Sequence, residues 1–287
     1  MQKYSILRHI WRAIYPLLIW LGITFISSFL LIFVITLVYI IRDGLEGDML
    51  IAAINSFQIE QGLAIVLMVN VLCSCVFIPI WVIMKKKLYV YENAKLKVTP
   101  VVLTLLSFIS FNIIVSIILG FIDIDQFFPT YIEVADILGS GTLLMQILSI
   151  GILAPIMEEV LSRGIILNRL LQWMPKWIAI LVSAALFAVI HFNLLQSLYA
   201  FVIGVAFAFV YLRYRNLWIP IIGHIAFNTT SIIFIEILDT TGADPNPWLL
   251  LIPATFISIL SVVLMLKVTK PASLAQKSDV VINNVQT

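Results

Sequence analysis

The sequence predicts an all-α, polytopic integral membrane protein with about eight transmembrane helices and both termini in the cytoplasm. Of the 287 residues, 62% are hydrophobic and 11% are charged, and the mean hydropathy is +1.11. Soluble domains are about 45–50% apolar and about 25% charged. The net charge of only +2 gives no basic surface for nucleic acid, so we expect no nucleic-acid partner.

Eight apolar stretches come close to the roughly 20 residues that cross the hydrocarbon core of a bilayer. The first is too long for the apolar core of a signal peptide, so we expect it to stay in the membrane. The turn after the fifth, His191-Phe192-Asn193, has little that demands water, and we expect it to be buried in protein. The predicted spans are Leu17–Ile41, Leu63–Met84, Val101–Ile122, Leu143–Leu167, Trp177–His191, Leu194–Leu212, Ile219–Leu238 and Trp248–Leu266.

The distribution of basic residues predicts the orientation of these spans. If the amino end is cytoplasmic, sixteen of the seventeen Lys and Arg residues lie inside and Arg42 alone lies outside, as the positive-inside rule requires. The inner cluster Lys85-Lys86-Lys87 is interpreted as a topology determinant. The predicted divisions are a cytoplasmic segment (1–16), three membrane helices with their loops (17–142), a helix bundle (143–266) and a flexible cytoplasmic tail (267–287).

Polar side chains inside the spans are few and concentrated. Charged groups in a membrane helix are costly and usually mark a functional site. The four-residue spacing of Glu159 and Arg163 puts both on one helix face and predicts an ion pair, whereas Glu158 is rotated by about 100° and stays available. The same spacing pairs His224 with Asn228, and lets Phe187 serve as an aromatic shelf for His191.

A free carboxylate, two imidazoles and a carboxamide are the parts of a hydrolytic centre. Glu158 can take a proton from water, one histidine can orient that water, and the other histidine or the amide can stabilise an oxyanion. Glu158, His191 and His224 could equally form a three-ligand zinc site with an open position. The residues do not choose between these two mechanisms. A rise of about 1.5 Å per residue places Glu158 and His224 about 8 Å from the inner face, but His191 about 21 Å from it.

Three ordered motifs, Glu158-Glu159-x-x-x-Arg163, Phe187-x-x-x-His191 and His224-x-x-x-Asn228, resemble those of the CAAX-processing and bacteriocin-processing (ABI, or CPBP) intramembrane endopeptidases. The resemblance covers about residues 143–238. It implies an intramembrane protease, glutamate- or metal-dependent, in which Glu158 activates water, His191 assists it, His224 and Asn228 surround the oxyanion, and Glu159 and Arg163 hold the helix.

The resemblance also implies a membrane-associated protein or peptide as substrate and a bacterial plasma membrane as location, with a role in bacteriocin or peptide processing or in self-immunity. Two other functions stay open. One is a non-catalytic membrane immunity or scaffold protein that uses the same cavity for binding. The other is a proton-coupled transporter with Glu158 and the histidines as its relay. The sequence does not predict the oligomeric state.

Overall fold

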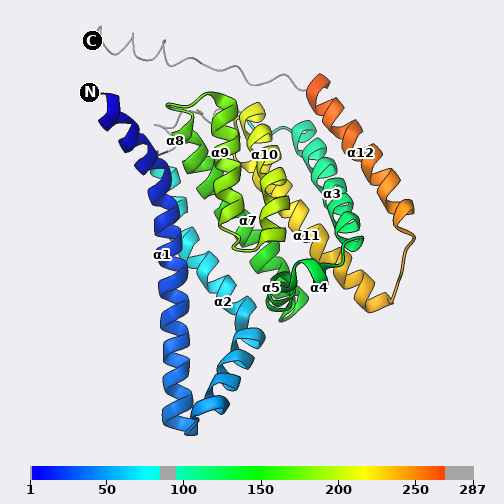
Figure 1. Ribbon diagram of the computed structural model, residues 1–287. Helices are drawn as coiled ribbons and strands as arrows, with labels where there is room; N and C mark the ends of the chain where they lie inside the picture. Colours follow the sequence, from blue (N-terminus) through cyan, green and yellow to red (C-terminus); the bar gives the residue numbers. More distant parts are fainter. Residues whose placement is uncertain (1, 85–94, 269–287) are drawn as a thin grey trace.

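The computed structural model describes residues 2–84 and 95–268, and these residues form helices joined by short connections (Figure 1). The cluster Lys85-Lys86-Lys87 and the tail from residue 269 onward lie outside the described residues. The elements in chain order are α1 (Gln2–Asp43), α2 (Gly47–Met84), α3 (Val98–Gly120), α4 (Ile124–Phe127), α5 (Pro129–Gly139), α6 (Leu143–Gln146), the π-helix η2 (Ile147–Leu153), α7 (Ala154–Glu159), the π-helix η3 (Val160–Leu167), α8 (Asn168–Leu170), α9 (Lys176–Val189), α10 (Leu194–Tyr214), α11 (Trp218–Thr241) and α12 (Pro247–Val268).

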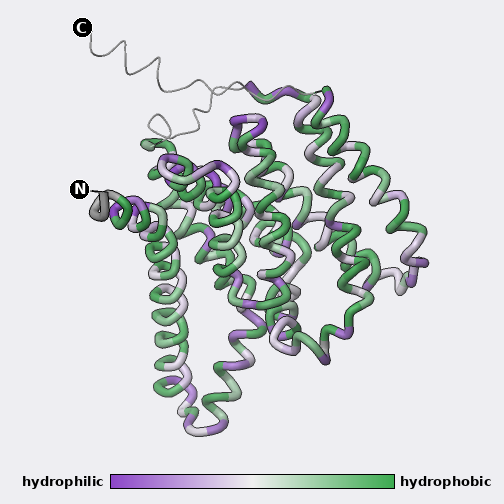
Figure 2. Tube along the Cα trace, turned by 45° about the horizontal axis from the view of Figure 1, so that its top comes forward, coloured by the Kyte–Doolittle hydropathy of each residue, from purple (hydrophilic) through white to green (hydrophobic). Residues whose placement is uncertain are grey.

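The chain is a multi-pass membrane protein. Within the described ranges, seven helical stretches are long and apolar enough to cross a membrane. The remaining predicted span, the fifth in chain order, is α9, which has only 14 residues and is therefore about 21 Å long. The start of α1 and the end of α12 lie on the same side of the molecule (Figure 1), as an even number of passes requires. Hydrophilic residues gather mainly near helix ends and connections (Figure 2).

The fourth span is not a uniform α-helix. It runs from Leu143 to Leu170 and contains two π-helical segments, η2 and η3, on either side of α7. Pro155 has no amide hydrogen and cannot complete the α-helical ladder, and π-helical turns are frequent at functional sites. In η2, side chains from other helices bond the backbone: Asn70 of α2 donates to the Ser149 carbonyl at 3.5 Å. The short helix α7 carries the two adjacent glutamates.

A proline in α1 explains how this helix attaches to the end of the fourth span. Pro16 lies inside α1, and its missing N–H leaves the Arg12 carbonyl without its helical donor. Arg169, which is almost fully buried, donates from Nη1 to that carbonyl and from Nη2 to the Tyr15 hydroxyl at 2.6 Å. The Arg169 guanidinium therefore supplies the hydrogen bond that Pro16 cannot donate, and it holds α1 against α8.

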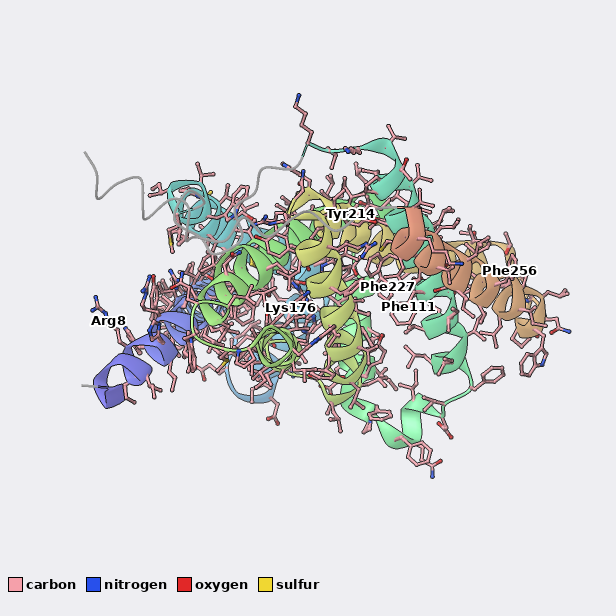
Figure 3. The ribbon with its side chains drawn as sticks, turned by 90° about the horizontal axis from the view of Figure 1, so that it is seen from above. Arg8, Phe111, Lys176, Tyr214, Phe227 and Phe256 are labelled. Atoms are coloured by element: carbon pink, nitrogen blue, oxygen red, sulfur yellow. The ribbon has the colours of Figure 1, made fainter. Side chains whose placement is uncertain are left out.

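Close approach of α11 to α3 shapes the other side of the bundle. A Cβ at Gly223 would lie 2.7 Å from Cδ2 of Phe108, so only glycine fits at this crossing. The rings of Phe111 and Phe227 meet at 6.2 Å between the same two helices (Figure 3). This packing fixes the height of α11, and thereby of His224, relative to the rest of the bundle.

Candidate active site

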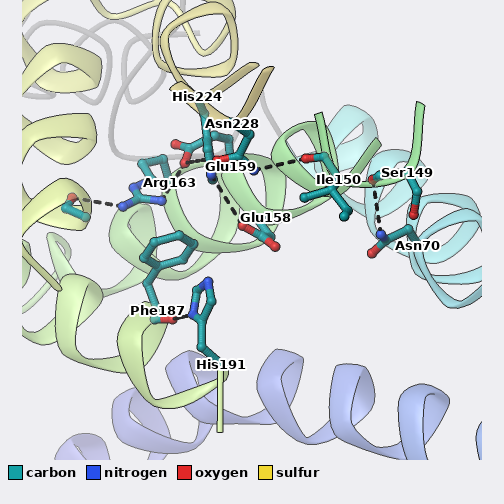
Figure 4. Close-up of polar contacts among 11 residues, drawn as sticks. Asn70, Ser149, Ile150, Glu158, Glu159, Arg163, Phe187, His191, His224 and Asn228 are labelled. Carbon is teal, nitrogen blue, oxygen red and sulfur yellow. Dashed lines mark hydrogen bonds and ion pairs between the residues drawn. The ribbon is translucent and has the colours of Figure 1, made fainter. Parts of the chain in front are cut away.

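A buried ion pair forms the base of the site (Figure 4). Arg163 Nη1 donates to Glu159 Oε1 at 2.6 Å, and neither side chain is exposed. Nη2 of the same guanidinium donates to the Gly204 carbonyl of α10 at 2.8 Å, while its Cζ lies 4.5 Å from the centre of the Phe187 ring. The predicted pair is therefore present, and it also joins the fourth span to α9 and α10.

His224 lies between the two glutamates. Its Nδ1 is 3.1 Å from Glu159 Oε1, and because a carboxylate only accepts, Nδ1 carries the hydrogen of this bond. Its Nε2 faces Glu158 Oε2 at 3.7 Å. In the imidazolium form the ring can pair with both carboxylates at once. Sequence spacing alone assigned Glu159 only to Arg163, whereas the structure makes this residue the anchor of His224 as well.

Glu158 is the more accessible of the two glutamates. Its side chain is 17% exposed, against 0% for Glu159, and Arg163, which forms its ion pair with Glu159, interacts with Glu158 only electrostatically. The expectation that one glutamate pairs with Arg163 and the other stays available therefore agrees with the geometry. Its role as a base stays a prediction.

His191 lies in the connection between α9 and α10, beside the aromatic shelf that the spacing predicts. The Phe187 and His191 rings meet edge-on with centroids 5.0 Å apart, and Phe187 also meets His224 at 5.9 Å. His191 Nδ1 is 2.9 Å from the Phe187 carbonyl. Because a carbonyl only accepts, Nδ1 carries the hydrogen, so Nε2 of the neutral ring has a free lone pair. Figure 4 shows this edge of the ring on the side of Glu158.

The expected burial of the turn after α9 is correct only in part. Asn193 is buried, His191 is half-buried, and Phe192 is 65% exposed. No hydrogen bond or ion pair joins His191 to Glu158 within the described part of the chain. Residue counting places His191 about 13 Å further from the inner face than His224. In the structure the two side chains are closer than this, because both rings contact Phe187.

Asn228 is half-buried, one helical turn after His224. Its Nδ2 donates to the Ile150 carbonyl of η2 at 2.9 Å, so one of its two amide hydrogens ties α11 to the fourth span. The second hydrogen is left for another acceptor. Asn228 therefore has a structural contact in addition to the role predicted for it.

Sequence reasoning missed a pair of tyrosines, one of which interacts with Glu158. Tyr199 of α10 interacts electrostatically with Glu158 and is hydrogen-bonded to Tyr131 of α5. Burial raises the pKa of the Tyr131 phenol, which keeps it a neutral hydrogen-bonding group. No sequence signal identifies the pair, because tyrosines near span ends resemble interfacial anchors.

Zinc binding by Glu158, His191 and His224 stays a prediction. Among the described residues, no three His, Cys, Asp or Glu side chains lie close enough together to hold one ion.

Comparison with known proteins identifies a match within the site-bearing part of the chain. Residues 140–230 match the family described as type II CAAX prenyl endopeptidase Rce1-like. YdiL of Bacillus subtilis (strain 168), which carries the provisional name of a membrane peptidase, is 34% identical over 89 residues, which are 31% of this chain and 36% of that protein. The matched part thus spans about a third of this relative's length. No solved structure matches the chain.

Proposed function

We propose that this protein is an intramembrane endopeptidase, because residues 140–230 match the family of type II CAAX prenyl endopeptidases of the Rce1-like kind and are similar to a relative named as a membrane peptidase. It hydrolyses a peptide bond of a membrane-associated protein or peptide, and Glu158 activates the attacking water. The observation that carries this proposal is the division of labour between adjacent glutamates: Glu159 is buried with Arg163 and His224, while Glu158 stays partly exposed.

In the first step, Glu158 takes a proton from water as the water oxygen bonds to the substrate carbonyl carbon. The neutral His191 ring orients the water through the lone pair on Nε2, because its Nδ1 hydrogen is held by the Phe187 carbonyl. The resulting oxyanion needs hydrogen-bond donors. His224 can donate from Nε2 when both ring nitrogens are protonated, and Asn228 can donate its second amide hydrogen.

In the second step, the carbon–nitrogen bond breaks and Glu158 returns the proton to the departing amine. Glu159 and Arg163 take no part in the bond changes. They hold His224 by its Nδ1 and fix the fourth span against α10. The biological process is proposed to be bacteriocin or peptide processing or self-immunity, as the resemblance implies.

The proposal is tested with Glu158→Gln, which keeps size and polarity but removes the base. Cells that lack the gene are complemented with the wild-type protein or with the Glu158→Gln variant. Glu46→Gln, at the exposed turn between α1 and α2, is the matched control. Membrane proteomes are then compared for new chain ends. We expect processing to fall by about 10²–10⁴-fold in the Glu158 variant only, the usual contribution of a general base.

Undiminished processing with inserted Glu158→Gln protein would refute the mechanism. If cells keep a protective phenotype when Glu158 and His191 are both replaced, the protein acts by binding, as a non-catalytic immunity or scaffold protein does.

A further inference from the structure

The position of His191 depends on a very short connection. Only residues 190–193 join α9 to α10, and the His191 side chain has a single hydrogen bond, to Phe187, among the described residues. The conformation of this connection therefore decides where Nε2 lies. Small displacements of a catalytic group can cost a large part of the rate, so whatever holds the connection also matters for the site.

Phe192, the next residue, has a left-handed backbone. Its φ is +53°, which is unfavourable for a bulky side chain. Such strain persists only where surrounding contacts enforce it, and it occurs preferentially at functional sites. The Phe192 side chain is the part of the residue that can supply those contacts.

Two aromatic residues of α1 receive the Phe192 ring. Trp20, which is only 9% exposed, stacks on it with centroids 6.3 Å apart and planes 12° from parallel. Phe25 meets it edge-on at 6.0 Å. Both arrangements are favourable for aromatic pairs. Figure 4 shows α1, in blue, passing on the side of His191.

The opposite end of the connection is held separately. Asn193 Oδ1 accepts from the Gln196 amide at 3.2 Å and caps α10, while its Nδ2 donates to the Thr130 hydroxyl in the first turn of α5 at 3.3 Å. The contacts on Phe192 and Asn193 thus hold the two residues that follow His191. The partners on α1 and at Thr130 lie outside the family-matched segment 140–230.

We infer that Trp20 and Phe25 are positioning residues for His191: they hold Phe192 in its left-handed conformation and thereby set the place of the His191 ring beside Glu158. The catalytic importance of this positioning rests on the proposed function. It makes α1 a working part of the active site, so the family-matched helices alone do not define the site geometry.

The test measures the position of His191 without using activity. Diethyl pyrocarbonate modifies unprotonated imidazole nitrogens, and peptide mass spectrometry reports its rate at each histidine of the purified full-length protein in detergent micelles. In Trp20→Ala we expect the rate at His191 to rise by roughly threefold or more, because a connection that opens locally exposes more of the ring. The rate at His224, which is buried, should stay unchanged and shows that the bundle remains folded.

Three further variants make the test specific. Trp20→Phe should restore the wild-type rate, because it keeps an aromatic partner for Phe192. Phe29→Ala is the matched control: Phe29 lies on the same helix, is 68% exposed and stacks on Phe33. Phe192→Gly relieves the backbone strain, since glycine adopts positive φ readily, and removes the ring through which Trp20 acts. Adding Trp20→Ala to Phe192→Gly should therefore change the His191 rate no further.

An unchanged His191 rate in Trp20→Ala, or a full additional effect of this substitution in the Phe192→Gly background, would overturn the inference. The same measurements in a Glu158→Gln background should give the same result, so they do not depend on whether the protein is a protease. If the proteome comparison shows no change in Glu158→Gln, the proposed function is refuted, whereas the positioning of His191 remains as a structural result.

Discussion

Replacing Arg163 by methionine is expected to destabilise the protein strongly. Arg163 is completely buried, and its two terminal nitrogens donate to Glu159 and to the Gly204 carbonyl. Methionine keeps an unbranched side chain but has no donor, so the Glu159 carboxylate would stay in the bundle with His224 as its remaining described partner. Breaking a buried ion pair by removing one partner costs about 3–5 kcal/mol.

That loss is a large fraction of the roughly 5–15 kcal/mol by which folded proteins are usually stable. It can be measured by titrating the purified protein from mild detergent into SDS and following tryptophan fluorescence. Arg42→Met is the matched control, because Arg42 is 79% exposed and its ion pair among the described residues is with its neighbour Asp43. We expect this surface substitution to change the free energy of unfolding by less than about 0.5 kcal/mol.

A double variant separates the ion pair from simple loss of packing. Glu159→Gln combined with Arg163→Met leaves no isolated charge from the pair, so its cost should fall below the summed costs of the single variants by about 1 kcal/mol or more. Arg163→Lys should be intermediate, because an ammonium group does not reproduce the fork that reaches Glu159 and Gly204 together. A cost of Arg163→Met under about 0.5 kcal/mol, or strict additivity in the double variant, would refute this reasoning.

Two other expectations concern helix packing. Gly223→Ala should lower the free energy of unfolding by about 1–3 kcal/mol, because the new Cβ would lie 2.7 Å from a Phe108 carbon. Gly120→Ala on α3 is the control: its new Cβ meets no atom within 4 Å, so it should be nearly neutral in the same SDS titration. Arg169→Ala removes the donors that bond α1 beside Pro16, so amide hydrogen exchange should accelerate in the first half of α1 but not in α10. Exchange rates in α1 equal to those of the wild type would contradict this account of the contact.

Much of the architecture follows from local sequence. Span length and hydropathy predict the membrane helices because each must satisfy its own backbone hydrogen bonds in lipid. The spacing of four residues predicts the Glu159–Arg163 pair and the contact of Phe187 with His191, because side chains one helical turn apart are neighbours whatever surrounds them. The fifth span is short already in its apolar run, and its helix ends at Val189, two residues before the predicted end.

Contacts between distant residues could not be predicted in this way. His224 reaches Glu159 across 65 positions of the chain, and Phe192 reaches Trp20 from a different helix. The Ile150 carbonyl in the π-helical segment η2 likewise accepts a hydrogen bond from Asn228, 78 positions away on another helix. Each of these features requires the relative height and rotation of two packed helices, which no local pattern encodes.

The sequence by itself determined that this is a membrane protein, which stretches are apolar enough to cross the bilayer, and which polar residues within those stretches are too costly to be explained without a function. The tertiary structure alone decided that one glutamate anchors both Arg163 and His224 while the other stays accessible, and that α1 supports the connection bearing His191. The physical reason is that hydropathy and helical period act within a few residues, whereas the chemistry of a site depends on distances of a few ångströms between side chains that only packing brings together.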